Sequence, residues 1–262
     1  MKIRDFINQY MLPGSLRLSK GSSREQISRF LVSVRPIRTE HSLIRIGGDA
    51  DGGYLVPDDL GGISVCFSPG VAATCDFEEA CARRGIRSFM ADYSVDGPPT
   101  QNPFFHFEKK YLGARNDAQF TTLESWVDRN APGETDMLLQ MDIEGSEYPV
   151  LLSASRETLR RFRTIVVEFH SLELLAERSG FQLIDLAFAR LTEDFDVVHA
   201  HVNNCTSVQR YKGFDLPPVM EFTFHRKDRS SSRAAATEFP HQLDRGNLAG
   251  RRDAILPPCW HG

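Results

Sequence analysis

The feature that most constrains the fold is the alternation of short apolar runs with amphipathic stretches in the middle of the chain. Four apolar runs typical of buried strands cover residues 63–68, 86–91, 137–141 and 165–169. Helical spacing of apolar residues recurs between and after them, at 77–81, 123–129, 148–159, 172–179 and 183–191. Strands that alternate with helices predict an α/β fold, a parallel sheet covered by helices on both faces. Two further strand patterns, 195–202 and 219–226, have no helix between them and predict a closing hairpin.

Length and composition bound the number of domains. The chain has 262 residues, of which 41% are hydrophobic and 25% charged, so it is globular and could hold one large domain or two small ones. The pattern favours one domain over residues 41–227. Residues 1–40 read as a helical extension, with helices expected at 3–10 and 24–34. Residues 228–262 turn to Ser, Arg, Ala and Pro and are expected to be a disordered tail without a packed fold.

Charge, cysteine usage and apolar runs exclude several classes of protein. A formal net charge of -4 gives no electrostatic reason to expect a nucleic-acid partner. An odd count of 5 Cys without a C-x-x-C pair argues against a disulfide framework and a cysteine zinc site. No run is long enough for a membrane span, and the start lacks a signal-peptide core, so we expect a cytoplasmic protein. Residues 1–40 could pack on a second subunit, which leaves a homodimer open.

The turn after the first core strand is the first candidate ligand site. Ser68, Gly70 and Val71 follow that strand and precede a helix, which is where open α/β sheets bind ligands. Gly70 would let the backbone approach a ligand closely. Asp92 ends the next strand, where a carboxylate can accept from both hydroxyls of a ribose. Absence of a G-x-G-x-x-G pattern gives poor support to a pyrophosphate site.

Carboxylates and imidazoles follow the later strands. Asp142, Glu144 and Glu147 come directly after the strand 137–141. Glu147 is expected to stabilise a helix N-terminus, while Asp142 and Glu144 must bind a cation, accept from hydroxyls or act as bases.

Glu168, His170 and His201 end the neighbouring strands, so we expect them to share one rim with Asp142. Burial there would shift each pKa unless the groups share protons or a metal. A divalent ion held by Asp142, Glu168, His170 and His201 is therefore one interpretation. The glycine-rich stretch 45–54, which contains Asp51 and Tyr54, could wall the crevice.

Taken together, these segments resemble the FkbM-type S-adenosylmethionine-dependent methyltransferases, particularly the branch that includes the methyltransferase-like 24 proteins. The resemblance covers about residues 40–227 and is carried by segments 45–54, 67–71, 76–78, 122–124, 140–147, 201–204 and 221–223. It implies a class I (Rossmann-like) methyltransferase sheet of about seven strands with an antiparallel last strand.

The resemblance also implies roles for individual residues. The methionine part of the cofactor would contact Ser68, Gly70 and Val71, its ribose Asp92 and its adenine Tyr93. Asp142 would lie near the methyl sulfonium. Apart from the resemblance, we expect acceptor or lid contacts from Asp51, Tyr54, Glu144 and Asn203.

Three functions remain open on the sequence. The leading one is an S-adenosylmethionine-dependent enzyme that methylates a hydroxyl of a small-molecule or glycan-like acceptor, with His170 or His201 as base and Asp142 and Glu168 as orienting groups or metal ligands. A nucleotide-dependent oxidoreductase shares Asp92 and the doubly wound sheet. The third is a binding protein that keeps the fold without turnover.

Overall fold

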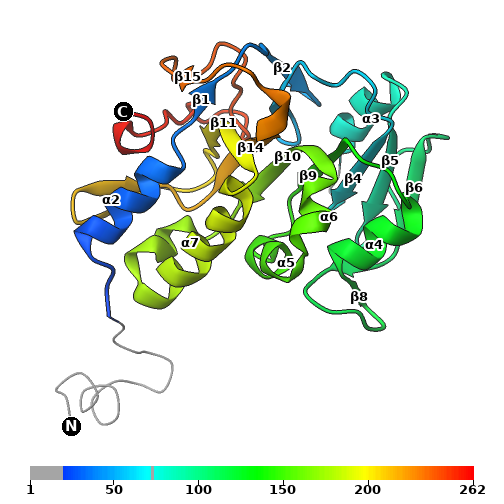
Figure 1. Cartoon of the computed structure of the whole chain (residues 1–262), viewed down its shortest axis with the longest axis horizontal. Coiled ribbons are helices and arrows are strands. Elements are labelled where there is room, and N and C mark those ends of the chain that lie inside the picture. The colour runs from blue at the N-terminus through cyan, green and yellow to red at the C-terminus, as the bar shows by residue number, and fades with distance from the viewer. Residues whose placement is uncertain (1–19, 72–73) are drawn as a thin grey trace, which may run out of the picture.

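The computed structural model describes residues 20–71 and 74–262 (Figure 1). The helix expected at residues 3–10 lies outside the described residues. A seven-stranded sheet crosses the molecule, made of β4 (Val65–Pro69), β5 (Arg87–Ala91), β6 (Phe105–Glu108), β9 (Met137–Met141), β10 (Phe162–Phe169), β11 (Phe195–Val202) and β14 (Met220–Arg226). Its order is β11-β14-β10-β9-β4-β5-β6.

The direction of the strands confirms the predicted fold class. β4 pairs in parallel with β5 and β9, and β9 with β10. The last strand, β14, is inserted antiparallel between β10 and β11. This order, with one reversed strand next to the edge strand, agrees with the class I methyltransferase sheet that the resemblance implied.

Two apolar layers hold the sheet. On one face lie α2 (Arg24–Ser33), α4 (Leu123–Asn130), α5 (Glu147–Ser153), α6 (Arg156–Arg160) and α7 (Arg178–Thr192), which share the larger core (Figure 1). The opposite face is covered by α3 (Asp76–Ala82) and the hairpin of β2 (Leu43–Ile46) and β3 (Tyr54–Pro57). Thr223 of β14 donates its hydroxyl to the carbonyl of Leu55 in β3 at 2.6 Å, which fixes the hairpin to the sheet.

Local capping explains where the sequence pattern misplaced helix boundaries. The single helix expected at 148–159 is two helices, because Ser155 accepts the amide of Thr158 and starts α6 anew. The helix expected at 172–179 is a 3-10 turn, Leu172–Ala176, followed by α7. Strand β6 was not predicted, since its alternation is weak on a half-buried edge.

The flanking segments pack against the domain. Helix α2 begins at a capping box made by Ser23 and Gln26. Two short strands, β1 (Ile37–Arg38) and β15 (Ala234–Ala235), pair antiparallel. Near the C-terminus Leu256 and Trp260 are buried in the larger core, where Trp260 lies edge-on to Phe30. The expectation of a disordered tail over residues 228–262 therefore does not hold in the structure, because a few apolar anchors outweigh the polar composition.

The remaining short elements lie in the connections. They are β7 (Tyr111–Leu112), β8 (Phe120–Thr121), β12 (Gln209–Tyr211), β13 (Phe214–Leu216) and the 3-10 turns Lys227–Arg229 and Pro258–Trp260. Among the described helices, none has the length and apolar character needed to cross a membrane.

Candidate functional site

The turn after β4 lies directly against the end of β9. Gly70 has a φ of +91°, and a Cβ atom there would come within 1.7 Å of the backbone oxygen of Asp142. Any side chain would therefore push the two loops apart. Gly70 was expected to let the backbone approach a ligand, and the close approach that the structure shows is to the backbone of Asp142.

Asp92 joins the loops that follow β4 and β5. One carboxylate oxygen accepts the amide of Val71 at 3.1 Å, and the other accepts the amide and hydroxyl of Ser94 at 2.7 and 2.6 Å. The amide of Gly70 also donates to the carbonyl of Ala91 at 3.0 Å. The two strand ends are thus held side by side, with the Asp92 carboxylate between them.

A cavity of about 400 Å³ opens beside these loops. Gly70, Asp92, Asp142 and Ile143 line it, together with the rings of Tyr111 and Phe120. These two aromatic residues were not predicted as cofactor contacts. They face each other in the β7–β8 pair, at a ring distance of 5.5 Å.

Three residues predicted to contact the cofactor, Ser68, Val71 and Tyr93, are not among those that line this cavity. The hydroxyl of Ser68 is fully buried, in hydrogen-bond contact with Gln140 at 2.6 Å and with Glu78. Val71 packs its side chain against Cys75 and Met90. The ring of Tyr93 lies against Tyr111, 5.5 Å away, rather than among the residues that line the cavity.

Ionisable side chains form a row across the ends of four neighbouring strands. Glu168 of β10 pairs with Glu221 of β14, and Glu221 pairs with His201 of β11. Val167 pairs with Met141, so Asp142 follows next to Glu168. Asp142, Glu168 and His201 were expected at one rim, and this register agrees with that expectation. Glu221 was not predicted as a site residue because the insertion of β14 between β10 and β11, and the register that places Glu221 beside Glu168 and His201, cannot be read from the sequence of β14.

Burial shifts the pKa values along this row. Burial, followed by the charges of Asp142 and Glu221, raises the pKa of Glu168 to about 10, although the amide of Asn203 donates to its carboxylate at 3.1 Å. Burial also raises the pKa of Asp142 to about 7, against the opposing effect of His170. These carboxyl groups therefore hold protons near neutral pH, which lets them exchange protons with a neighbour.

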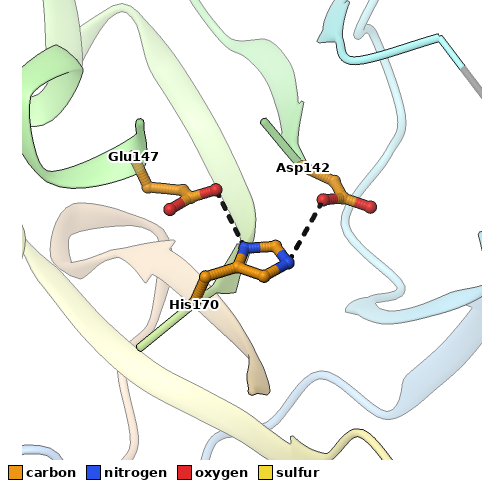
Figure 2. A group of neighbouring side chains, drawn as sticks. All are labelled: Asp142, Glu147 and His170. Carbon is orange, nitrogen blue, oxygen red and sulfur yellow. Dashed lines mark hydrogen bonds and ion pairs between the residues drawn. The ribbon is translucent and has the colours of Figure 1, made fainter. Parts of the chain in front are cut away.

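His170 lies among carboxylates, and Figure 2 shows it between Glu147 and Asp142. Its Nδ1 is 3.1 Å from Glu147, and its Nε2 is 3.5 Å from Glu144, 3.6 Å from Glu168 and 4.0 Å from Asp142. Burial by itself would lower the pKa of His170, but the bond to Glu147 and the surrounding negative charges outweigh it and raise that pKa.

Glu147 does more than stabilise a helix N-terminus, the role that the sequence suggested. Its side chain is fully buried, and the oxygen that meets His170 also accepts the amides of Ile143 at 3.2 Å and Gly145 at 3.0 Å. A carboxylate that receives these amides is an acceptor, so Nδ1 of His170 carries the proton and Nε2 faces the row. Glu147 thereby fixes both the loop after β9 and the imidazole.

His201, at the far end of this row, has partners of its own. Its Nδ1 is 3.5 Å from Glu221 and its Nε2 is 3.1 Å from Asp253. Burial would lower its pKa, but the hydrogen bond and charge of Glu221 raise it to about 9. The structure thus unites Asp142, Glu168 and His170, while His201 is engaged elsewhere. Within residues 20–71 and 74–262, the one group with metal-ligand spacing is Asp142, Glu147 and His170, whose ligand atoms lie within 4.8 Å.

The predicted acceptor or lid residues surround the row. Asp51 and Tyr54 line a second, smaller cavity of about 40 Å³ together with Asp142. The hydroxyl of Tyr54 accepts from Gln140 at 3.3 Å. Glu144 has a φ of +55° and an 88% exposed side chain, so it stands at the mouth of the site.

Comparison with known proteins identifies the domain. Residues 85–206 match the methyltransferase FkbM domain, which confirms the resemblance to the FkbM-type methyltransferases over that part of the chain. No curated protein matches the chain. Similar solved structures include a chain of the fibrillarin/Nop5p complex, with 9% identity over 63% of this chain and 73% of that chain and a TM-score of 0.39. Another is the N-methyltransferase NodS from Bradyrhizobium japonicum WM9, with 10% identity over 78% and 95% and a TM-score of 0.35.

Proposed function

The chain carries a methyltransferase FkbM domain over residues 85–206, and from this premise we propose that it transfers a methyl group from S-adenosylmethionine to a hydroxyl oxygen of a small-molecule or glycan-like acceptor. The observation that carries the proposal is the placement of His170 Nε2 between Asp142 and Glu168 at the strand ends. A hydroxyl has a high pKa, so its attack on carbon needs a group that removes the proton.

The residues around the 400 Å³ cavity fit S-adenosylmethionine. Asp92 would accept from the ribose hydroxyls, Tyr111 or Phe120 would contact adenine, and the turn at Gly70 would pass along the methionine part. Asp142 lines this cavity and also lies beside His170, so it links the cofactor side to the row. When bound, S-adenosylmethionine supplies an electrophilic methyl group.

The chain's own residues then orient the acceptor and move its proton. As the acceptor oxygen forms its bond to the methyl carbon, its proton passes to Nε2 of His170, leaving an ether and S-adenosylhomocysteine. Glu147 holds Nδ1–H in place, and the negative charges of Glu147, Asp142 and Glu144 stabilise the imidazolium. His201 is engaged with Glu221 and Asp253, so His170 is the better base of the two predicted.

Cofactor binding is tested first by calorimetry with S-adenosylmethionine and NAD. We expect binding of S-adenosylmethionine that is lost in Asp92→Ala and kept in Asp96→Ala, which removes an exposed loop carboxylate. Binding of NAD alone would contradict the proposal and favour an oxidoreductase.

Turnover is tested next with a panel of hydroxyl and amine acceptors and detection of released S-adenosylhomocysteine. Methylation of a hydroxyl acceptor supports the proposal, and transfer to amines alone overturns the oxygen specificity. Loss of turnover with a chelator would instead assign deprotonation to a divalent ion near Asp142, Glu147 and His170. Binding of S-adenosylmethionine without turnover of any acceptor would indicate a binding protein.

A further inference from the structure

The segment Asp244–Asp253, here called the C-terminal strap, runs beside the row of ionisable side chains. It lies beyond the last strand of the sheet and outside the residues that match the FkbM domain. Both of its ends meet histidines of β11. Asp244 is 2.9 Å from Nε2 of His199, and Asp253 is 3.1 Å from Nε2 of His201. The strap is therefore held at two points on one strand.

Further hydrogen bonds hold the middle of the strap to the residues after β11. The side chain of Asn204 accepts the amide of Leu248 at 2.8 Å and donates to its carbonyl at 3.3 Å. Arg251 donates to the carbonyl of Cys205 at 2.7 Å. All of these contacts are polar, so water can replace each of them when the strap moves away.

Asn247 connects the strap to the row itself. Its side-chain amide donates to Glu221 at 2.6 Å and to Asp51 at 3.3 Å. Glu221 stands between Glu168 and His201, and Asp51 lines the small cavity with Asp142. One side chain of the strap thus joins the sheet to the loop between β2 and β3.

The strap lies where an acceptor would have to enter. The carboxyl ends of the strands are where open α/β sheets bind their ligands, yet Glu168, Glu221 and His201 are at most 5% exposed here. Apart from the atoms of the Asp244–His199 ion pair, the buried polar atoms without a hydrogen-bond partner in this region include Oε2 of Glu168 and Oδ1 of Asn247. Unpaired buried polar atoms are rare in native proteins and cost free energy, so the closed position leaves polar groups for an acceptor to satisfy.

We infer that the C-terminal strap is a movable cover over the acceptor side of the site, tethered by Asn247 and by the Asp244 and Asp253 contacts, and that it lifts to admit the acceptor to the row. The inference rests on the proposed function, because that function makes the row the acceptor side. A strap that formed a permanent part of the core would differ from this cover in one measurable way: its amides would exchange only when the whole domain unfolds.

Hydrogen exchange and limited proteolysis of the full chain test the cover directly. The strap contains Arg245, Arg251 and Arg252 as trypsin sites. In the unmodified protein we expect the amides of residues 245–252 to exchange well before those of β10. Asn247→Ala and Asp253→Asn should each increase cleavage within the strap by about tenfold, because cleavage follows the population of the open form.

Asp196→Asn is the matched control, since it removes an ion pair between Asp196 and Arg233 outside the strap. It should leave cleavage within the strap unchanged. Melting temperatures measured on the same samples identify a variant that has lost its fold, and Asn247→Ala, which removes no charge, then carries the test.

Two results overturn the cover. One is exchange of residues 245–252 at the rate of β10 in the unmodified protein; the other is unchanged cleavage in Asn247→Ala. Calorimetry with S-adenosylmethionine separates this outcome from failure of the proposed function. Strap variants should bind the cofactor as the unmodified chain does, because Asp92 and Gly70 lie on the other side of Asp142 in the strand order. Absent cofactor binding in every sample would contradict the function and leave the exchange result to decide the cover.

Discussion

At the scale of single residues, small groups of atoms decide what the site can do. Gly70 is needed because the loop after β4 passes over the backbone of Asp142. Glu147 is needed because one buried oxygen receives two loop amides and the imidazole of His170. Gly70 is required by its contact with Asp142, and Glu147 by its contact with His170. In both cases the partner follows a different strand of the sheet.

Gly70→Ala should abolish binding of S-adenosylmethionine. The new Cβ would clash with the backbone oxygen of Asp142. The alanine would also have to adopt an unfavourable positive φ. Gly85→Ala is the matched control, since Gly85 has a φ of +76° but no heavy atom near its Cβ position. That variant should lose only about 1 kcal/mol of stability and keep the cofactor. Calorimetry and thermal melts compare the two, and equal cofactor affinity in both variants would refute the role of the close approach.

Glu147→Gln should lower the pKa of His170, because the neutral amide no longer stabilises the imidazolium. NMR titration of the His170 ring measures this directly and would also report a changed tautomer. Once an acceptor is found, His170→Ala should slow methyl transfer by about 10²–10⁴-fold. Glu157→Gln, on the exposed side of α6, serves as control and should alter neither quantity. An unchanged His170 titration in Glu147→Gln would show that Glu147 supports the loop alone.

At the scale of elements, the reversed strand β14 builds the row. Its antiparallel register places Glu221 between Glu168 and His201, although the three residues lie far apart in the chain. Burial is the main cause of the raised pKa of Glu168, and the charges of Asp142 and Glu221 on the two neighbouring strands add to it. The C-terminal segment is the other decisive element, since Trp260 fills a place beside Phe30 of α2 and Phe222 of β14.

Trp260→Ala should destabilise the fold by about 3–5 kcal/mol, because it removes a fully buried aromatic ring. Its indole N–H also donates to the carbonyl of Asp215 at 2.9 Å. Ile255→Ala, which changes a side chain that is 56% exposed, should have little effect. Urea unfolding, followed by the fluorescence of Trp126 or by circular dichroism, measures the stability of both variants. Equal stability of the two variants would mean that the C-terminal segment is not packed as described.

At the scale of the whole molecule, buried ionisable groups couple stability to pH. Asp142, Glu168 and His201 each have a folded pKa above the usual value of the side chain. Each therefore binds its proton more tightly in the folded chain than in the unfolded chain. Unfolding consequently releases protons at pH values between the unfolded and the folded pKa. Their contribution is fully present below the unfolded pKa of each group and is lost as pH rises through the folded values of about 7, 10 and 9.

The free energy of unfolding should therefore fall between pH 6.5 and pH 9. A group whose unfolded pKa lies below this range and whose folded pKa lies above it lowers the free energy of unfolding by about 1.4 kcal/mol per pH unit. Urea titrations at the two pH values measure the change. Glu168→Gln and His201→Gln each remove one titrating group and should flatten the dependence. A stability that rises over this interval would contradict the protonation states assigned to the row.

The sequence by itself determined the α/β class, the closing hairpin and the strand ends at which Asp142, Glu168 and His170 meet. Periodicity carries that information, because a buried strand and an amphipathic helix each need a repeating pattern of apolar residues along the chain. Tyr111, Phe120 and Glu221 were not predicted as site residues, because their importance depends on what faces them.

Only the tertiary structure decided the partners. In it, His201 contacts Glu221 and Asp253, and His170 contacts Glu147. The C-terminal segment packs against the domain. The physical reason is that pairing across strands and burial of a few large side chains join residues with no regular spacing in the sequence. A polar segment with one well-placed tryptophan looks disordered in composition, and only the surface that receives Trp260 gives it a fixed place.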